Sequence, residues 1–293
     1  MDISFVIISY NDDFNLLRAV GSAALKCARE RLKPEIWVVD NGSTDYTPWV
    51  LSQLGQVLGE RLKVIRLPRN MGTTRPRNLA LARAAGRVVC VMDSDAALAR
   101  GSLRGVMSLV EGCPSVGIVG PRIVVPGRGV YDSAKMVPTL VDKMLKLPRI
   151  LMGLPAPNRD WYTEFPFHRP TPVHTVISCC WVFRREVFRR IGPLDERIFY
   201  APEDVDWCLR AWKAGLGVVY YPYLSVIHHT RQITHRMPIS PVAFSHMKGL
   251  GYYWLKHRYL LSRRHVVRHY IEPTLPRVQH ELRAWEARIE VVA

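Results

Sequence analysis

Short apolar runs and segments with helical periodicity alternate along the first hundred residues. The apolar runs are bounded by turn-forming residues, which is typical of buried strands, and they cover residues 1–9, 35–40, 62–68 and 88–93. The segments between them have helical spacing or helix-start signals, and they cover residues 13–30, a stretch from Thr47-Pro48 and residues 79–86. The alternation predicts parallel strand-helix-strand units, in which each strand delivers a polar loop to the same edge of a sheet.

The second half of the chain continues this pattern less regularly. Helices are predicted over 102–111, 185–192 and 205–214. Strands are predicted over 115–125 (as one strand or a hairpin), 176–183 and 215–222, the last of them of the edge type. Residues 121–175 are rich in proline and irregular, but their aromatic residues argue against disorder, so we expect part of them to form a mobile loop.

Two carboxylates follow directly on the fourth apolar run. In VVCVMDSDA, residues 88–96, Asp93 and Asp95 come at the carboxyl end of the predicted strand, which is where open α/β sheets bind ligands. Hard oxygen donors at this spacing suit Mg²⁺ or Mn²⁺ shared with phosphates. On these residues alone, a helix cap at Asp93 and a solvated Asp95 explain the pattern equally well. For Glu203-Asp204 taken alone, the ordinary explanation is favoured over a functional one, because acids commonly stabilise a helix N-terminus.

Three loops at the predicted sheet edge carry charged side chains. They hold Asp40, Arg77 and the Asp93/Asp95 pair. The chain has neither a GxGxxG nor a GxxxxGK[ST] motif, which disfavours a dehydrogenase and a P-loop enzyme. A metal ion on the two aspartates, together with Arg77, is the available candidate for holding phosphates.

The chain is strongly basic, with a formal charge of +16, and this favours polyanionic partners. Nucleic acid, an anionic membrane and phosphorylated substrates all qualify. No acidic residue occurs between Asp206 and Glu272, and from Ile239 onward aromatic and aliphatic residues alternate with Arg, Lys and His at roughly helical spacing. Such a segment either lies on an anionic membrane surface or packs on the domain with a solvated basic face, and the sequence leaves both open.

Composition also bears on the location of the protein. No run of about 18 apolar residues occurs, and the N-terminus enters a predicted strand almost at once, so we expect a cytoplasmic protein. The six cysteines show no CxxC pair and lie in apolar surroundings. We interpret them as reduced core residues.

Several of these segments resemble the family 2 glycosyltransferases. The matching stretches are FVIISYN, VVDNGSTD, NMGTTRPRN, VMDSDA and the run from RREVFRRIGPLDERIFYAPEDVDWCLRAWKAG to His228. They occur in the family's order over about three-quarters of the chain, and the second half is most similar to bacterial rhamnosyl- and galactofuranosyl-type enzymes that build surface polysaccharides. The chain departs from the family at Pro76, where alanine is common, and at Ser178-Cys179-Cys180, which replaces a Gly-containing stretch.

The resemblance implies an α/β fold of GT-A type, with a mostly parallel central sheet flanked by helices and a basic helical C-terminal extension. It divides the chain into a catalytic domain, 1–238, and the extension, 239–293. Within the domain, 1–100 is expected to bind the nucleotide and 101–238 the acceptor, with the mobile loop over the acceptor side. The implied reaction is inverting, metal-dependent transfer from a UDP- or dTDP-sugar to a saccharide or lipid-linked acceptor.

The resemblance also implies roles for individual residues. The donor would be bound by Tyr10, Asn11, Asp40, Asn41, Gly72, Arg77 and Asp93. Asp95 and His228, but not His229, would ligate Mn²⁺ or Mg²⁺. Asp204 is the expected catalytic base with Glu203 beside it, and the acceptor-side candidates are Asp195, Cys179 and Trp207.

Two alternatives belong to other functional classes. A nucleotidyltransferase acting on sugar phosphates also uses an α/β sheet and acidic metal ligands, but it usually has a glycine-rich loop where this chain has Ser9-Tyr10-Asn11. A nucleic-acid-binding protein is suggested by charge alone, so nucleic acid is an unlikely partner. For the enzyme, we expect peripheral contact of the C-terminal basic helices with the inner face of the cell membrane.

Overall fold

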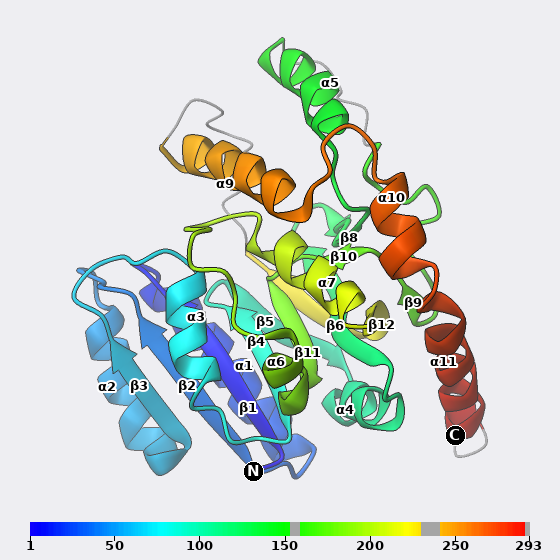
Figure 1. Ribbon diagram of the computed structural model, residues 1–293. Coiled ribbons are helices and arrows are strands. Elements are labelled where there is room, and N and C mark those ends of the chain that lie inside the picture. Colours follow the sequence, from blue (N-terminus) through cyan, green and yellow to red (C-terminus); the bar gives the residue numbers. More distant parts are fainter. Residues whose placement is uncertain (153–158, 230–240, 291–293) are drawn as a thin grey trace.

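The computed structural model describes residues 1–152, 159–229 and 241–290 (Figure 1). The N-terminal half contains the predicted parallel strands, which are β1 (Ile3–Ser9), β2 (Pro34–Asp40), β3 (Leu62–Arg66) and β4 (Val88–Asp93) in the spatial order β3-β2-β1-β4. The intervening helices are α1 (Asp13–Arg29), α2 (Thr47–Leu58), η1 (Gly59–Arg61) and α3 (Thr74–Leu81). The predicted parallel strand-helix-strand units are therefore confirmed.

Helix α3 differs from the prediction at both ends. It begins at Thr74 rather than at residue 79, and it ends at Leu81 rather than at Gly86. Proline is tolerated in a first helical turn, so Pro76 does not prevent the earlier start. The hydroxyl of Thr74 donates to the carbonyl of Ile198, 2.9 Å away, and this tertiary contact supports the first turn.

The second half of the sheet is joined through antiparallel pairings. Strand β11 (Cys180–Arg184) runs antiparallel to both β4 and β6 (Val116–Val125). Strand β12 (Gly217–His228) lies between β6 and β5 (Ala96–Gly101). The prediction that the segment 215–222 forms an edge strand was wrong, because β12 is longer and has partners on both sides. Strand β5 was not predicted.

Most of the segment 121–175 that the structure describes is more regular than expected. It contains β7 (Gly129–Val130), β8 (Ala134–Lys135), α5 (Leu140–Leu151), β9 (Thr171–Pro172) and β10 (Thr175–Val176). A capping box starts α5: the hydroxyl of Thr139 accepts from the backbone N–H of Asp142, and the Asp142 carboxylate accepts from the N–H of Thr139. Residues 153–158 of this segment lie outside the described part, and its mobility remains a prediction.

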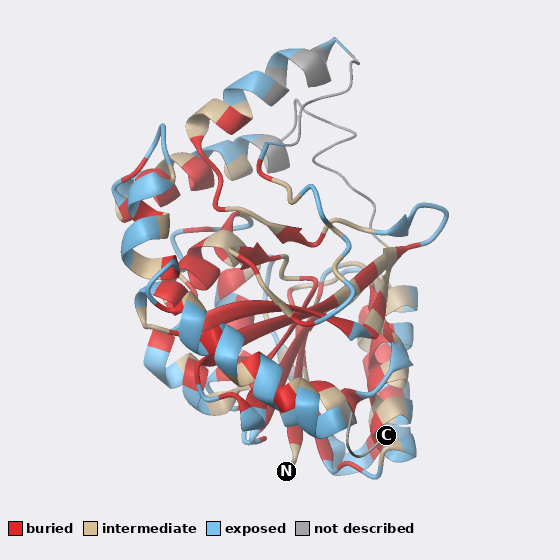
Figure 2. Cartoon of the chain, turned by 90° about the vertical axis from the view of Figure 1, so that its right-hand side faces the viewer, coloured by how far each residue is buried: buried red, intermediate tan, exposed pale blue. Residues whose placement is uncertain are grey.

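Helices cover the sheet, and some of them extend beyond it at one end of the molecule. The remaining ones are α4 (Leu103–Gly112), α6 (Arg185–Ile191), α7 (Glu203–Lys213), α9 (Pro241–His257), α10 (Arg264–Val266), η2 (Val267–Ile271) and α11 (Leu275–Glu290). The strands at the centre of the sheet are mostly buried, whereas α5 and α9 carry many exposed positions and lie at the end of the molecule opposite the N-terminus (Figures 1 and 2).

The C-terminal segment packs on the domain through α11. Val278, Leu282 and Trp285 belong to the same buried apolar cluster as the N-terminal strands. The indole N–H of Trp285 donates to the hydroxyl of Ser108 on α4, 3.2 Å away. The proposed boundary at residue 238 lies outside the described residues.

Two expectations from composition can be compared with the described structure. All six cysteines are free and buried, as predicted. In the described part of the chain, no helix combines the length and apolar character needed to span a bilayer.

Candidate active site

The end of β4 and the end of β12 form one cluster. Nε2 of His228 lies 3.2 Å from Oδ1 of Asp95. The pairing of β12 with β5 sets His228 opposite Ala96, the residue after Asp95, and the backbone N–H of His229 donates to the Asp95 carbonyl at 2.8 Å. An antiparallel strand that starts right after the two aspartates therefore brings them beside a distant histidine.

The cluster offers suitable donors for a divalent metal ion. Asp93, Cys179 and His228 each provide a donor atom, and these atoms lie within 4.8 Å of one another. Nδ1 of His228 is buried and has no hydrogen-bond partner among the described residues. Because carboxylate oxygens and imidazole suit Mn²⁺ and Mg²⁺ with phosphates, the residues fit such an ion. Cys179, predicted on the acceptor side, is buried at this cluster, and the Asp93 N–H donates to its carbonyl.

Arg77 connects this cluster to the acidic pair of α7. Its guanidinium is 2% exposed and donates to Oδ1 of Asp93 at 2.6 Å and to Oε1 of Glu203 at 2.7 Å. Glu203 also accepts from the hydroxyl of Ser178 at 2.9 Å. These contacts hold the Glu203 carboxylate in place as a partner for Arg77.

Burial and charge act in opposite directions on the pKa values of these groups. It raises the pKa of Glu203 to about 7, although Arg77 acts in the opposite direction. Burial also raises the pKa of Asp93 against the charge of Arg77. For Arg77 itself, burial lowers the pKa, but the charges of Asp93 and Glu203 outweigh it and the pKa rises. Arg77 thus stays charged between two carboxylates.

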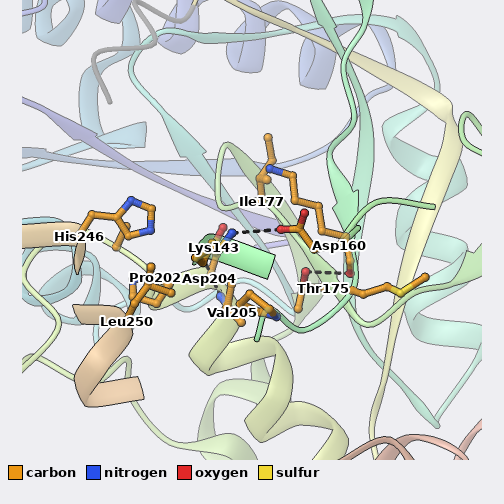
Figure 3. A pocket seen from close by; sticks show the side chains of 13 residues that line it. Lys143, Asp160, Thr175, Ile177, Pro202, Asp204, Val205, His246 and Leu250 are labelled. Carbon is orange, nitrogen blue, oxygen red and sulfur yellow. Dashed lines mark hydrogen bonds and ion pairs between the residues drawn. The ribbon is translucent and has the colours of Figure 1, made fainter. Parts of the chain in front are cut away.

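Asp204 faces a cavity of about 130 Å³ (Figure 3). One of its oxygens accepts from the backbone N–H of Val205 at 2.8 Å, which caps the first turn of α7. Burial raises the pKa of Asp204, while its hydrogen bond to Val205 and the charge of Lys135 lower it. Asp204 is therefore the member of the acidic pair that borders open space.

The cavity has basic and apolar walls. Its polar lining includes Lys135, Lys143, Asp160 and His246, with Nζ of Lys143 3.0 Å from Oδ2 of Asp160. These residues come from β8, α5, the segment before β9 and α9. Sequence reasoning missed all four, since none belongs to a motif and only the tertiary structure brings them beside Asp204.

The candidate nucleotide-binding loops lie after β1 and β2. Tyr10 is 48% exposed. Asn11 has a φ of 49°, and its side-chain oxygen accepts from the N–H of Thr44 at 2.8 Å. Asp40 is buried, and its Oδ1 accepts from the N–H of Ser43 at 2.9 Å. The two loops are thus joined at the carboxyl edge of the sheet.

Asn41 and Gly72 have positional roles in the structure. Nδ2 of Asn41 donates to the Gly72 carbonyl at 2.8 Å, and its Oδ1 accepts from the N–H of Met71. Gly72 has a φ of +81°, and a Cβ there would lie 2.1 Å from the carbonyl oxygen of Phe199. Only glycine suits this approach, which connects the loop after β3 to the loop before α7.

Two acceptor-side candidates lie away from the cavity. Asp195 binds Arg197, Lys256 and Tyr252; burial raises its pKa, but these hydrogen bonds bring the pKa far below its usual range. Trp207 is fully buried and stacks on Trp181 with ring centroids 5.2 Å apart. Asp195 thus holds α9, and Trp207 belongs to the core, because the stacked indole has no exposed surface.

The fold and the site together define a glycosyltransferase of the GT-A type. The chain belongs to glycosyl transferase family 2, whose family model matches residues 4–192. It is 31% identical over 254 residues to the N-acetylglucosaminyl-diphospho-decaprenol L-rhamnosyltransferase of Mycobacterium tuberculosis, covering 82% of this chain and 80% of that protein. It is 26% identical over 229 residues to the O-antigen biosynthesis protein RfbC of Myxococcus xanthus, covering 76% of this chain and 17% of that protein.

Solved structures support the same fold. GalNAc-T7 with UDP, GalNAc and Mn²⁺ superposes with a TM-score of 0.65 at 14% identity, over 92% of this chain and 57% of that chain. The mannosyltransferase PcManGT of Pyrobaculum calidifontis, with GDP-Man and Mn²⁺, gives a TM-score of 0.58 at 17% identity, over 97% of this chain and 75% of that chain. At these identities the likeness concerns the fold alone.

Proposed function

We propose that this enzyme is an inverting, metal-dependent glycosyltransferase of surface polysaccharide biosynthesis. It moves a sugar from a UDP- or dTDP-sugar to a saccharide or lipid-linked acceptor. The name of the M. tuberculosis relative supports this, because it describes rhamnosyl transfer to a sugar on a diphospho-decaprenol lipid. The observation that carries the proposal is the position of Arg77. It joins Asp93, at the cluster that fits a divalent ion, to the first turn of α7, which bears Asp204.

Asp95 and His228 would hold Mn²⁺ or Mg²⁺. When bound, such an ion supplies positive charge that stabilises a departing diphosphate. The carboxylate of Asp93 accepts a hydrogen bond from Arg77, and this bond holds the carboxylate in place beside the cluster. The GalNAc-T7 and PcManGT structures each contain Mn²⁺ with a nucleotide or nucleotide sugar, which supports a divalent ion here.

Asp204 acts as the general base. Its carboxylate borders the cavity, where it takes the proton of the acceptor hydroxyl as the new glycosidic bond forms. Glu203 is held by Arg77 and Ser178, so it positions the turn and does not act as a nucleophile. One base opposite one leaving group gives a single displacement with inversion.

Asp40 and Tyr10 hold the base of the donor. One oxygen of Asp40 accepts from Ser43, and the carboxylate has a second oxygen to accept the imide N–H of uracil or thymine. Tyr10, half exposed at the neighbouring loop, offers a ring for stacking. We expect the enzyme in the cytoplasm, where a lipid-linked acceptor would bring it into peripheral contact with the membrane.

Donor turnover tests this proposal. The purified enzyme is incubated with a panel of UDP-, dTDP- and GDP-sugars, and released nucleotide is identified by mass spectrometry with Mn²⁺ and with EDTA. We expect release from a uridine or thymidine donor that EDTA and Asp95→Ala abolish. Glu186→Ala is the matched control, since Glu186 is an exposed carboxylate paired with Arg184. Turnover unaffected by EDTA and by Asp95→Ala contradicts the metal role.

A further inference from the structure

Helices α5 and α9 carry many exposed positions at one end of the molecule (Figure 2), and several of these positions hold large apolar side chains. We name this surface the apolar rim. It consists of Met144 and Leu145 from α5, Met152 directly after α5, Phe244, Met247 and Leu255 from α9, and Leu260 and Leu261 from the turn that follows α9. The exposed fraction is 72% for Phe244 and 81% for Leu255. Single exposed apolar residues are ordinary, but a group of this kind marks an interaction surface.

Helix α9 carries both buried and exposed apolar side chains. Leu250, Tyr253 and Trp254 are buried against the domain in one apolar cluster. Phe244, Met247 and Leu255 stay exposed. The packing on the domain therefore leaves part of the apolar surface of α9 uncovered.

Contacts join the start of α5 to the turn that follows α9. The backbone N–H of Leu140, at the start of α5, donates to the carbonyl of Leu260 at 2.8 Å. Arg263 forms an ion pair with Asp142 on α5. These contacts hold the start of α5 against the turn that follows α9.

The charge around the rim suits an anionic surface. Exposed Lys248, Arg258, Arg264 and Arg268 lie on α9 and the segments that follow it. The chain has no acidic residue between Asp206 and Glu272, and Asp142 is paired with Arg263. Basic residues beside exposed apolar ones are the combination by which a protein surface binds anionic lipid.

The rim adjoins the cavity at Asp204. Lys143 precedes Met144 and Leu145 on α5 and lines the cavity (Figure 3). His246 precedes Met247 on α9 and lines it too. The two helices that bear the rim therefore also form walls of the cavity that borders the proposed base.

We propose that the apolar rim docks on an anionic phospholipid bilayer and so brings the cavity at Asp204 to the head of a lipid-linked acceptor. This deepens the proposed function and rests on it for the acceptor. The proposal also changes the predicted membrane contact of residues 239–293 in two ways. It leaves out α11, which packs on the domain, and it adds α5, which lies outside that segment.

Vesicle sedimentation of the full chain tests the docking. The probes are vesicles of equal parts phosphatidylglycerol and phosphatidylcholine, and vesicles of phosphatidylcholine alone. The first variant pair is Met144→Gln with Leu145→Gln, and the second is Met247→Gln with Leu255→Gln. The matched control is Leu25→Gln with Val57→Gln, which changes equally exposed apolar residues of α1 and α2. Thermal melting of each protein verifies that it is folded.

We expect the wild type and the control to bind the anionic vesicles, and each rim pair to weaken binding by about tenfold or more. Binding is also expected to fall with added salt and to be weak on neutral vesicles. Wild type that stays in solution with both vesicle types overturns the proposal, as does unchanged binding by both rim pairs.

The docking and the sugar transfer are separated by one further variant. Asp204→Asn is expected to bind vesicles as the wild type does. A wild type that docks on vesicles but releases nucleotide from no donor contradicts the transfer reaction and leaves the docking supported. Nucleotide release by a wild type that never sediments contradicts the docking alone.

Discussion

Nη1 of Arg77 lies 2.7 Å from Oε1 of Glu203, although 126 residues separate them in the chain. The other side of the same guanidinium lies 2.6 Å from Oδ1 of Asp93. Arg77 is nearly inaccessible to solvent, so the two carboxylates have a buried cation as partner. The arginine thereby connects the end of β4 to the first turn of α7.

Removal of this guanidinium is expected to destabilise the fold. In Arg77→Met, two largely buried carboxylates lose their cation, and the free energy of unfolding should fall by about 3–5 kcal/mol. Urea unfolding measures the change. Arg87→Met is the control: Arg87 is 66% exposed and lies 3.6 Å from Asp2, so its loss should cost at most about 1 kcal/mol. Equal losses in both variants contradict the bridging role.

Asp204→Asn should retain donor binding and lose turnover. An amide keeps the shape of the side chain but does not take a proton, so the rate should fall by about 10² to 10⁴. Isothermal titration with the nucleotide and a transfer assay measure the two quantities. Retained turnover would remove Asp204 from the role of base.

Asp206→Asn is the matched control on the same helix. Oδ1 of Asp206 lies 2.6 Å from Nζ of Lys256 and 2.8 Å from Nε2 of His257, so this carboxylate holds α9. Its replacement should lower Tm more than Asp204→Asn does, because it breaks a buried ion-pair network. The opposite order of Tm values contradicts this assignment.

His228→Ala should weaken Mn²⁺ binding, whereas His229→Ala should not. The His228 imidazole contacts Asp95, but His229 reaches Asp95 only through its backbone N–H, which alanine retains. We expect a loss of affinity of about 100-fold for His228→Ala, since a direct ligand matters at least as much as its supporting partners. Electron paramagnetic resonance of free Mn²⁺ gives both affinities. Equal affinities for the two variants argue against His228 as a ligand.

Trp207→Ala should act through stability. The side chain is fully buried and stacked on Trp181, so its removal should cost about 3–5 kcal/mol. Trp49, which is 62% exposed, is the control, and Trp49→Ala should change stability by no more than about 0.5 kcal/mol. Chemical unfolding measures both. A stable Trp207→Ala protein with a raised acceptor KM would restore the acceptor-side role.

Stability should fall as the pH is lowered below neutrality, in part through His174. Burial, together with the charge of Arg263, lowers the pKa of His174 to about 4. Between about pH 6.5 and 4 the unfolded chain binds this proton and the folded chain does not, so stability declines by up to about 1.4 kcal/mol per pH unit. Urea unfolding at several pH values should show a shallower decline in His174→Gln. Identical slopes in both proteins contradict the assignment.

Local patterns in the sequence predicted much of the architecture. The strands β1, β2 and β4 follow from short apolar runs, since a strand buried on both faces needs apolar residues at successive positions. Parallel strands bring their carboxyl ends to the same edge of the sheet, so Asp40 and Asp93 lie at one edge. The resemblance to family 2 added the pairing of Asp95 with His228, which no spacing within the chain indicates.

Other features depend on contacts between distant segments. Helix α3 begins five residues early because Thr74 bonds to Ile198, and β5 exists because β12 pairs with it. Packing also sets the location of three predicted site residues. Trp207 lies in the core, Asp195 lies beside α9, and Cys179 lies beside Asp93 and His228.

The sequence alone therefore determined the alternation of strands and helices up to β4 and the chemistry of the loops at the sheet edge, because periodicity and turn residues act over a few neighbouring positions. The tertiary structure decided which polar groups meet, since strand register and helix packing join residues that lie far apart in the chain. Arg77 shows the difference: its charge is evident in the sequence, but its position between Asp93 and Glu203 exists only in the folded protein.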